Sequence, residues 1–154
     1  MRTIKNYKNA IIRRIIRSYK NLFIKIYGKQ DLMYKYKGLK LLLNLKKDVD
    51  FLIYFDSFES KNLKLYQTMI KSGNIVFDVG ANIGIYSLLA SKSLGKDGQI
   101  YSFEPSETAF KRLNINVTLN NFKNIICSSV IVPVIICHCN CKSVEEFFAK
   151  VSAV

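Results

Sequence analysis

The apolar positions in the middle of the chain alternate between two spacings. Two short runs, NIVFDV at residues 74–79 and QIYSFE at 99–104, have few polar positions, which is typical of strands buried on both faces. Residues 84–94 and 106–116 instead place apolar side chains at helical spacing. A third apolar run, NIICSSVIV at 124–132, predicts another strand. Buried strands that alternate with helices predict an α/β fold, a parallel sheet with crossover helices.

Two short apolar stretches precede this region. LKLLLNL at residues 39–45 and DFLIYF at 50–55 predict two strands that pair as a hairpin, with residues 46–50 as the turn. Residues 60–73 then show helical spacing, with Ser60 as the N-cap and Gly73 as the stop. The apolar face of this predicted helix consists of Leu63, Tyr66, Met69 and Ile70.

The net charge of +13 comes from one end of the chain. Residues 1–47 hold 14 of the 24 Lys and Arg residues and a single acid, Asp31, so that 14 − 1 = 13. Residues 48–154 hold the remaining 10 basic residues and 10 acids, and they sum to zero. The basicity therefore characterises an N-terminal segment and not the α/β region.

The first 30 residues predict a basic amphipathic helix. Apolar residues recur at helical spacing from Ile4 to Ile26, and Lys and Arg fall mostly between them. Charges interrupt every apolar run, so this segment predicts neither a membrane span nor a secretory signal. Three alternatives stay open: packing on the protein's own domain, contact with an anionic membrane surface, or contact with nucleic acid.

Candidate chemistry lies where the first buried strand ends. In a doubly wound sheet, ligands bind at the carboxyl ends of the strands, where the chain turns into a helix. Gly80 can adopt a backbone conformation closed to other residues, and Gly84 would remove a side chain where a ligand lies against the helix start. Peptide N–H groups at that helix start could face the ligand. Glu104 ends the next strand, 20 residues after Gly84, at the spacing that places a carboxylate on ribose hydroxyls.

The spacing of the glycines narrows the class of ligand. A dinucleotide site needs G-x-G-x-x-G, but here Asn82 and Ile85 occupy the second and third glycine positions. No Gly-Lys-Ser/Thr follows, so the turn is not a phosphate-binding P-loop either. A carboxylate, Asp78, before the first glycine favours a ligand with a positive charge and no pyrophosphate. S-adenosylmethionine, with its ammonium and sulfonium groups, fits that description.

The segment FDVGANIGIYSLLASKSLGKDGQIYSFEPSETAFKRLNINVTLNN resembles a known family. It is similar to the first half of the S-adenosylmethionine-binding domain of FkbM-family methyltransferases, over roughly residues 59–125. The motifs that carry the resemblance are the D-V-G-A-N-x-G turn, the F-E-P after the second strand, and a helix with R-L-x-x-N followed by an Asn-Asn pair. The resemblance implies a Rossmann-like methyltransferase fold and O-methylation of a small-molecule or glycan acceptor.

The resemblance also implies roles for individual residues. The methionine end of S-adenosylmethionine would be surrounded by Asp78, Gly80, Asn82 and Gly84. Glu104 would accept hydrogen bonds from the ribose hydroxyls, and Pro105 and Ser106 would border the adenine. Arg112, Leu113 and Asn116 would be structural. No residue is assigned as a catalytic base.

The resemblance ends near residue 126, where the composition changes. Residues 127–154 contain 6 of the 10 Val, all 4 Cys and 1 of the 13 Asn. We interpret this as a truncated or frame-shifted reading of a longer gene, with a sheet that is incomplete at its C-terminal side. The cluster of Cys137, His138, Cys139 and Cys141 lacks the two separated Cys pairs of a zinc site, so we expect no metal and no catalytic role for His138.

These observations predict four regions and one leading function. The regions are a basic helix at 1–30, short strands at 31–58, the S-adenosylmethionine-binding half of a methyltransferase domain at 59–126, and a divergent tail at 127–154. We expect S-adenosylmethionine-dependent methyl transfer in the cytoplasm, with doubtful activity if the acceptor half is missing. The alternative is a non-catalytic nucleoside-binding or membrane-associated fragment, attached through residues 1–30. The sequence shows no N-P-P-Y-like motif, so we do not expect a nucleic-acid acceptor.

Overall fold

The computed structural model describes residues 18–26 and 31–130. The chain divides into two compact units between Thr68 and Met69, and each unit is described by itself. The predicted tail at 127–154, including its Cys and His cluster, and most of the predicted N-terminal helix lie outside the described residues.

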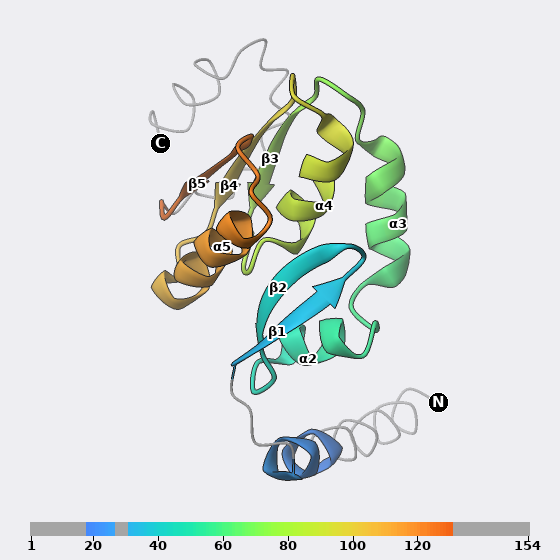
Figure 1. The fold of residues 1–154 in the computed structure, drawn as a ribbon, viewed down its shortest axis with the longest axis vertical. Coiled ribbons are helices and arrows are strands. Elements are labelled where there is room, and N and C mark those ends of the chain that lie inside the picture. Colours follow the sequence, from blue (N-terminus) through green and yellow to red (C-terminus); the bar gives the residue numbers. More distant parts are fainter. Residues whose placement is uncertain (1–17, 27–30, 131–154) are drawn as a thin grey trace, which may run out of the picture. The chain divides into compact units, whose positions relative to one another are not determined.

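The first unit contains a β-hairpin and short helices. Strands β1 (Asp31–Tyr36) and β2 (Leu39–Asn44) pair antiparallel through a two-residue turn (Figure 1). Both turn residues, Lys37 and Gly38, have positive φ angles of 48° and 79°, the conformation that matches the twist of paired strands. A hairpin was therefore predicted correctly, but with the wrong partner for β2.

The segment predicted as the second strand of the hairpin is a helix. Helix α2 (Asp48–Tyr54) contains most of the DFLIYF run. Asp48 and Asp50 lie in its first turn, where negative charge complements the helix dipole. Residues 31–36, in which alternate positions are exposed, take the place beside β2 instead.

Ser60 was predicted as the N-cap, which would make residue 61 the first residue of the helix. Helix α3 (Ser60–Met69) instead begins at Ser60 itself. The carbonyl of Glu59 accepts the N–H of Leu63 at 2.9 Å, so Glu59 occupies the N-cap position and Ser60 lies inside the helix. Leu63 is fully buried, as predicted, whereas Met69 is 66% exposed and does not belong to a buried face.

The second unit is a three-stranded parallel sheet with two crossover helices, which confirms the predicted α/β fold class. The strands β3 (Ile75–Val79), β4 (Gln99–Phe103) and β5 (Ile125–Ser128) pair in that order (Figure 1). Helices α4 (Ile85–Leu94) and α5 (Glu107–Leu119) connect them. Both crossovers run in the same direction, and such connections are right-handed, so both helices cover the same face of the sheet.

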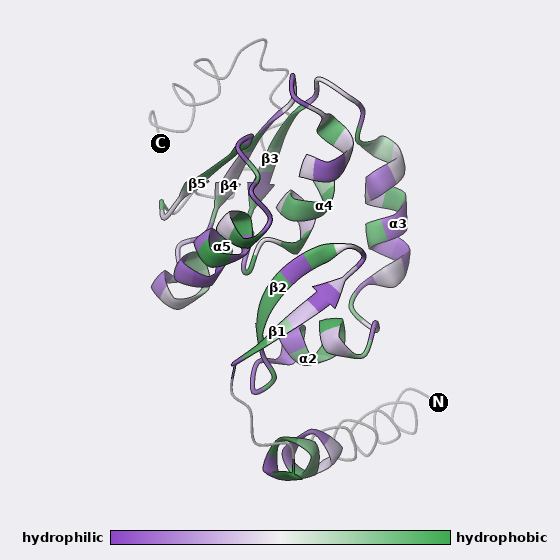
Figure 2. Ribbon diagram, viewed as in Figure 1, coloured by the Kyte–Doolittle hydropathy of each residue, from purple (hydrophilic) through white to green (hydrophobic). Residues whose placement is uncertain are grey.

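The two faces of the sheet differ in burial. Under the helices, Ile100 and Ser102 are fully buried and Ile125 is 8% exposed. Around α5, hydrophobic and hydrophilic residues alternate, as expected of a helix with one buried face (Figure 2). On the opposite face of the sheet, Ile75 and Ile126 are about half exposed. The edge of β3 away from β4 pairs with no other strand among residues 18–26 and 31–130.

A buried carboxylate secures the hairpin to α2, and its removal tests this arrangement. Asp50 is 1% exposed and its Oδ2 accepts the backbone N–H of Asn44 at 2.5 Å. We expect Asp50→Ala to lower the free energy of unfolding by about 2 kcal/mol, because the N–H loses its acceptor inside the protein. Urea unfolding followed by circular dichroism measures this.

Asp31→Ala is the matched control for that change. Asp31 also accepts a hydrogen bond from Asn44, from its side-chain Nδ2 at 3.0 Å, but in an exposed position. We expect a change near zero, since water replaces an exposed acceptor. Equal effects of the two substitutions would contradict the role of Asp50.

Candidate functional site

The candidate site lies at the carboxyl ends of β3 and β4. The β3–α4 turn at residues 80–84 and the β4–α5 link at 104–106 both leave the sheet at this edge. All candidate site residues predicted from the sequence lie in these two connections or next to them. The structure brings the two connections together, because parallel neighbouring strands end side by side.

One buried carboxylate joins the two connections. Glu104 is 7% exposed. Its Oε2 accepts the backbone N–H of Asn82 at 2.7 Å, and its Oε1 accepts the backbone N–H of Ser106 at 2.8 Å. The N–H of Glu104 itself donates to the carbonyl of Ser128 at 3.0 Å. The Glu104 side chain therefore fixes the distance between the turn after β3 and the start of α5.

The turn after β3 has three residues in the left-handed region. Gly80, Asn82 and Gly84 have φ angles of 80°, 51° and 89°. Most of the N–H groups here are already bound by protein acceptors: those of Gly80 and Ala81 by the Phe103 carbonyl, that of Gly84 by the Ala81 carbonyl, and that of Asn82 by Glu104. We expected unpaired N–H groups at the start of the helix, but that of Gly84, the N-cap of α4, is bound by the Ala81 carbonyl, and that of Ser87 is bound by Asp78. The expectation is wrong for these two groups.

The surroundings of Gly80 and Gly84 differ, so the two positions are occupied by glycine for different structural reasons. A Cβ atom added to Gly84 would lie 2.5 Å from Cδ1 of Leu113, a fully buried side chain on α5. The expected reason for Gly84, close approach of a ligand, is thus corrected: its missing side chain makes room for Leu113. A Cβ on Gly80 would meet nothing within 4 Å. Gly80 is the glycine with open space beside it.

Asp78 is the second carboxylate of the site. It lies opposite Ser102 of β4 in the parallel register. Its Oδ2 accepts the Oγ–H of Ser87 at 2.5 Å and the N–H of Ser87 at 3.1 Å. Burial raises the pKa of Asp78 above its ordinary value; the hydrogen bonds from Ser87 oppose this, and the negative charge of Glu104 adds to it. A positively charged ligand group near Asp78 would relieve this cost.

The sequence analysis missed Ser87 and Ser102. Both are fully buried, and their hydroxyl oxygens lie 2.6 Å apart, which extends the hydrogen-bond chain from Asp78 through α4 into β4. A signal for them exists: each is the one serine within a mostly apolar run, IYSLLA or QIYSF. A polar residue kept in such a run needs a hydrogen-bond partner.

Cys127 of β5 lies opposite Ser102 in register, in the same row as Asp78. Burial, and to a lesser extent the negative charge of Asp78, raise the pKa of the Cys127 thiol to about 11. The thiol is therefore protonated at neutral pH, and Cys127 is not an activated nucleophile.

Helix α5 packs against the turn after β3. Asn116 is fully buried, and its Nδ2 donates to the carbonyl of Ile83 at 2.9 Å. Together with Leu113 it has the structural position expected for it. Ser106 occupies the predicted N-cap position of α5, but its side chain makes no capping hydrogen bond. Pro105 and Ser106 are exposed next to Glu104.

The described residues contain neither a metal-binding cluster nor a helix that could cross a membrane. No three His, Cys, Asp or Glu side chains of residues 18–26 and 31–130 gather closely enough to hold a metal ion. Within the same residues, no helix has the length and apolar character needed to cross a bilayer.

The chain is similar to proteins of one enzyme class. It is 41% identical over 63 residues to a ribosomal protein L11 methyltransferase from Caldanaerobacter subterraneus subsp. tengcongensis. These residues make up 41% of this chain and only 20% of that protein. No family model matches the chain.

Two solved structures share the architecture. Trm5b from Pyrococcus abyssi superimposes with a TM-score of 0.54 at 22% identity, over 66% of this chain and 28% of that one. TYW2 from M. jannaschii in complex with AdoMet superimposes with a TM-score of 0.56 at 22% identity, over 67% of this chain and 44% of that one. The chain has the fold of S-adenosylmethionine-dependent methyltransferases. The predicted cofactor agrees with the AdoMet bound to TYW2. We expected that the acceptor is not a nucleic acid. These comparisons do not support that expectation.

The unequal roles of the two glycines can be tested by stability. We expect Gly84→Ala to lower the free energy of unfolding by about 3 kcal/mol, from left-handed backbone strain and overpacking against Leu113. Gly80→Ala meets only the strain, which amounts to about 1 kcal/mol. Urea unfolding of both variants measures the difference. Equal losses would show that the contact with Leu113 is unimportant.

The raised pKa of Asp78 predicts a dependence of stability on pH. The folded protein holds this proton more tightly than the unfolded chain does. The stability that Asp78 contributes is therefore complete below its ordinary pKa of 3.8 and is lost as the pH rises through the raised value. We expect Asp78→Asn to unfold at a higher temperature than the parent at pH 7, with the difference vanishing as the pH falls below 3.8. A difference that is independent of pH would refute this.

Proposed function

We propose that this chain supplies the S-adenosylmethionine-binding half of a methyltransferase. The observation that carries the proposal is the buried Glu104 carboxylate, which bridges the turns after β3 and β4 at the strand ends. The fold supports it, because ligands of open α/β sheets bind at this edge. The 63 residues with 41% identity to a curated methyltransferase support it as well.

The site fits the nucleoside part of the cofactor. Each carboxylate oxygen of Glu104 accepts one backbone N–H and has a second lone pair with which to accept a hydrogen bond. Two adjacent ribose hydroxyls can donate to these lone pairs. Pro105 and Ser106, exposed directly after Glu104, would border the adenine.

The site also fits the charged methionine end. Asp78 is a carboxylate with a raised pKa, and nearby positive charge stabilises its ionised form. The space beside Gly80 leaves room for a ligand next to the backbone. The Asn82 side chain, two residues after Gly80, is half-buried and carries an amide that can both donate and accept. Gly84 contributes by shaping the turn through its contact with Leu113.

Bound S-adenosylmethionine would supply an activated methyl group on a sulfonium. The residues of this chain bind and orient that group, and orientation accounts for much of the barrier reduction in a transfer of this kind. We assign no catalytic base to the described residues. We propose membership of the FkbM family and a hydroxyl oxygen of a small molecule or glycan as the acceptor, on the basis of the D-V-G-A-N-x-G and F-E-P motifs.

A protein acceptor is the second candidate. The observation that favours it is the name of the curated relative, a ribosomal protein L11 methyltransferase. Incubation with cell extract and S-adenosylmethionine carrying a tritiated methyl group separates the two candidates. Label in extractable small molecules or glycans supports the first, label in acid-precipitated protein that protease releases supports the second, and label that nuclease releases contradicts both.

Cofactor binding itself is tested at Glu104. We expect Glu104→Ala to weaken the binding of S-adenosylhomocysteine at least about tenfold, because hydrogen bonds to a buried charge are among the stronger ones. Isothermal titration calorimetry at pH 7 measures this, with circular dichroism to confirm that the variant is folded.

Glu107→Ala is the matched control. Glu107 lies three residues further along, is exposed, and forms an ion pair with Lys111 at 2.6 Å on the surface of α5. We expect its affinity to stay within about twofold of the parent. A parent chain that is folded but does not bind S-adenosylhomocysteine would contradict the proposed function, as would a Glu104→Ala variant that binds like the parent.

A further inference from the structure

One face of the helix at residues 18–26 packs against other residues of its own unit. The rings of Phe23 and Phe55 lie 5.4 Å apart, so this face packs against α2 and its C-terminal end. Lys20 is 9% exposed, and its Nζ donates to the Lys46 carbonyl at 2.7 Å. These contacts fix which side of the helix points to the rest of its unit. The opposite side of the helix is exposed, as Leu22 and Ile26 show.

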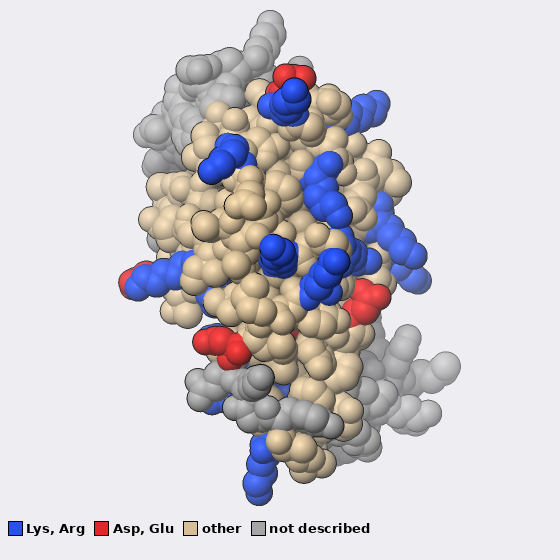
Figure 3. Space-filling view, in the orientation of Figure 1, with Lys and Arg blue, Asp and Glu red and all other residues tan. Residues whose placement is uncertain are grey.

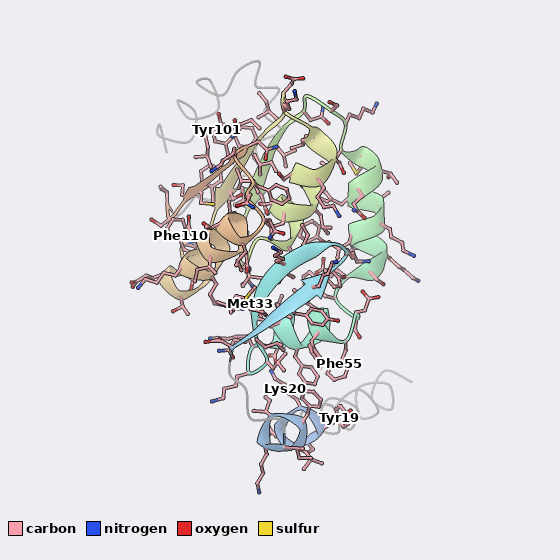
Figure 4. The ribbon with its side chains drawn as sticks, in the orientation of Figure 1. Tyr19, Lys20, Met33, Phe55, Tyr101 and Phe110 are labelled. Atoms are coloured by element: carbon pink, nitrogen blue, oxygen red, sulfur yellow. The ribbon has the colours of Figure 1, made fainter. Side chains whose placement is uncertain are left out.

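The exposed part of this helix includes an apolar strip. Tyr19, Leu22 and Ile26 are 55%, 56% and 64% exposed. Their spacing of three and four residues places them on one helical face. Tyr19 stands at the border of the two sides, with its ring 6.3 Å from that of Phe55 (Figure 4). A contiguous apolar strip of this kind indicates an interaction surface, in contrast to scattered single apolar residues.

The charged residues of the N-terminal segment, residues 1–30 of the sequence, all have one sign. Residues 1–30 carry no acid and nine basic residues: Arg2, Lys5, Lys8, Arg13, Arg14, Arg17, Lys20, Lys25 and Lys29. Lys25 is exposed within the described helix. Elsewhere, on the face of the molecule shown in Figure 3, Lys and Arg side chains lie scattered and not in a continuous stripe. The complementary partner of the N-terminal segment is therefore anionic.

We propose that this apolar strip, together with the basic residues of the N-terminal segment, docks onto an anionic lipid bilayer. A helix parallel to the membrane places its apolar side chains at the boundary of the acyl chains and its cations among the lipid phosphates. The strip of Tyr19, Leu22 and Ile26 meets the first requirement. The eight basic residues of the segment other than Lys20 meet the second, since Lys20 is buried and ion-paired with Asp48. The proposal is independent of the S-adenosylmethionine site.

The apolar strip is what distinguishes a bilayer from RNA as the partner. Nucleic-acid affinity comes mainly from contacts between Lys or Arg and phosphate, and such contacts leave exposed Leu and Ile side chains in water. A bilayer instead removes Leu22 and Ile26 from water while it neutralises the cations. The two partners therefore respond differently when an aliphatic residue is replaced.

Vesicle co-sedimentation of the full chain tests the proposal. The probes are vesicles of phosphatidylcholine alone and of phosphatidylcholine mixed with an equal amount of phosphatidylglycerol. We expect binding to the anionic vesicles and little binding to the neutral ones. Ile26→Glu should weaken the binding to anionic vesicles about tenfold, because it removes an inserted side chain and adds a repelled charge.

Leu65→Glu is the matched control. Leu65 lies on α3 and is 64% exposed, the same exposure as Ile26, so both variants lose an equally exposed aliphatic side chain and gain one negative charge. We expect Leu65→Glu to bind within about twofold of the parent. Circular dichroism of both variants confirms that neither exposed substitution unfolds the chain.

Several outcomes would overturn the proposal. One is equal binding to neutral and anionic vesicles, and another is no binding to either. Equal losses for Ile26→Glu and Leu65→Glu would show that net charge alone is at work. Vesicle binding that is unaffected by Ile26→Glu, together with salt-sensitive RNA binding, would assign the basic segment to nucleic acid.

Discussion

The candidate site depends on a single buried carboxylate. Glu104 accepts one backbone N–H from each of the two connections that leave the carboxyl edge of the sheet. A buried acceptor of this kind is costly to leave unpaired, so its hydrogen bonds hold both connections in place. Asp78, in contrast, accepts its hydrogen bonds from the hydroxyl and the backbone N–H of Ser87, and burial raises its pKa. The site thus combines one carboxylate that organises the backbone with one whose charge is poorly compensated.

Much of the second unit could be predicted from the sequence. The strands at β3, β4 and β5 are short apolar runs bounded by polar residues, and the helices between them end at Gly95 and begin after Ser106 as expected. These local signals agree with the global fold, and they place Asp78 and Glu104 at the same edge without further information. The register that puts Asp78 opposite Ser102 follows from the sheet and could not be obtained from spacing alone.

Other features depend on tertiary context. DFLIYF has strand-like composition, yet Asp48 and Asp50 start a helix there because residues 31–36 already pair with β2. Gly80 and Gly84 look equivalent in the sequence; only the position of Leu113 on α5 shows that one is packed and the other open. Ser87 resembles ordinary helix residues until its hydroxyl is seen next to Asp78. Each difference arises from a partner that lies far away along the chain.

The contacts between α5 and the turn after β3 relate the candidate site to the order in which the chain is synthesised. Ile83 and Gly84 are held by Asn116 and Leu113, about thirty positions later in the sequence. The bend after β3 therefore cannot acquire its final shape while a nascent chain still lacks α5. A ribosome-bound chain that ends before this helix would have the glycines and Asp78 but not the contacts that hold Ile83 and Gly84, so that this turn is completed late in biosynthesis.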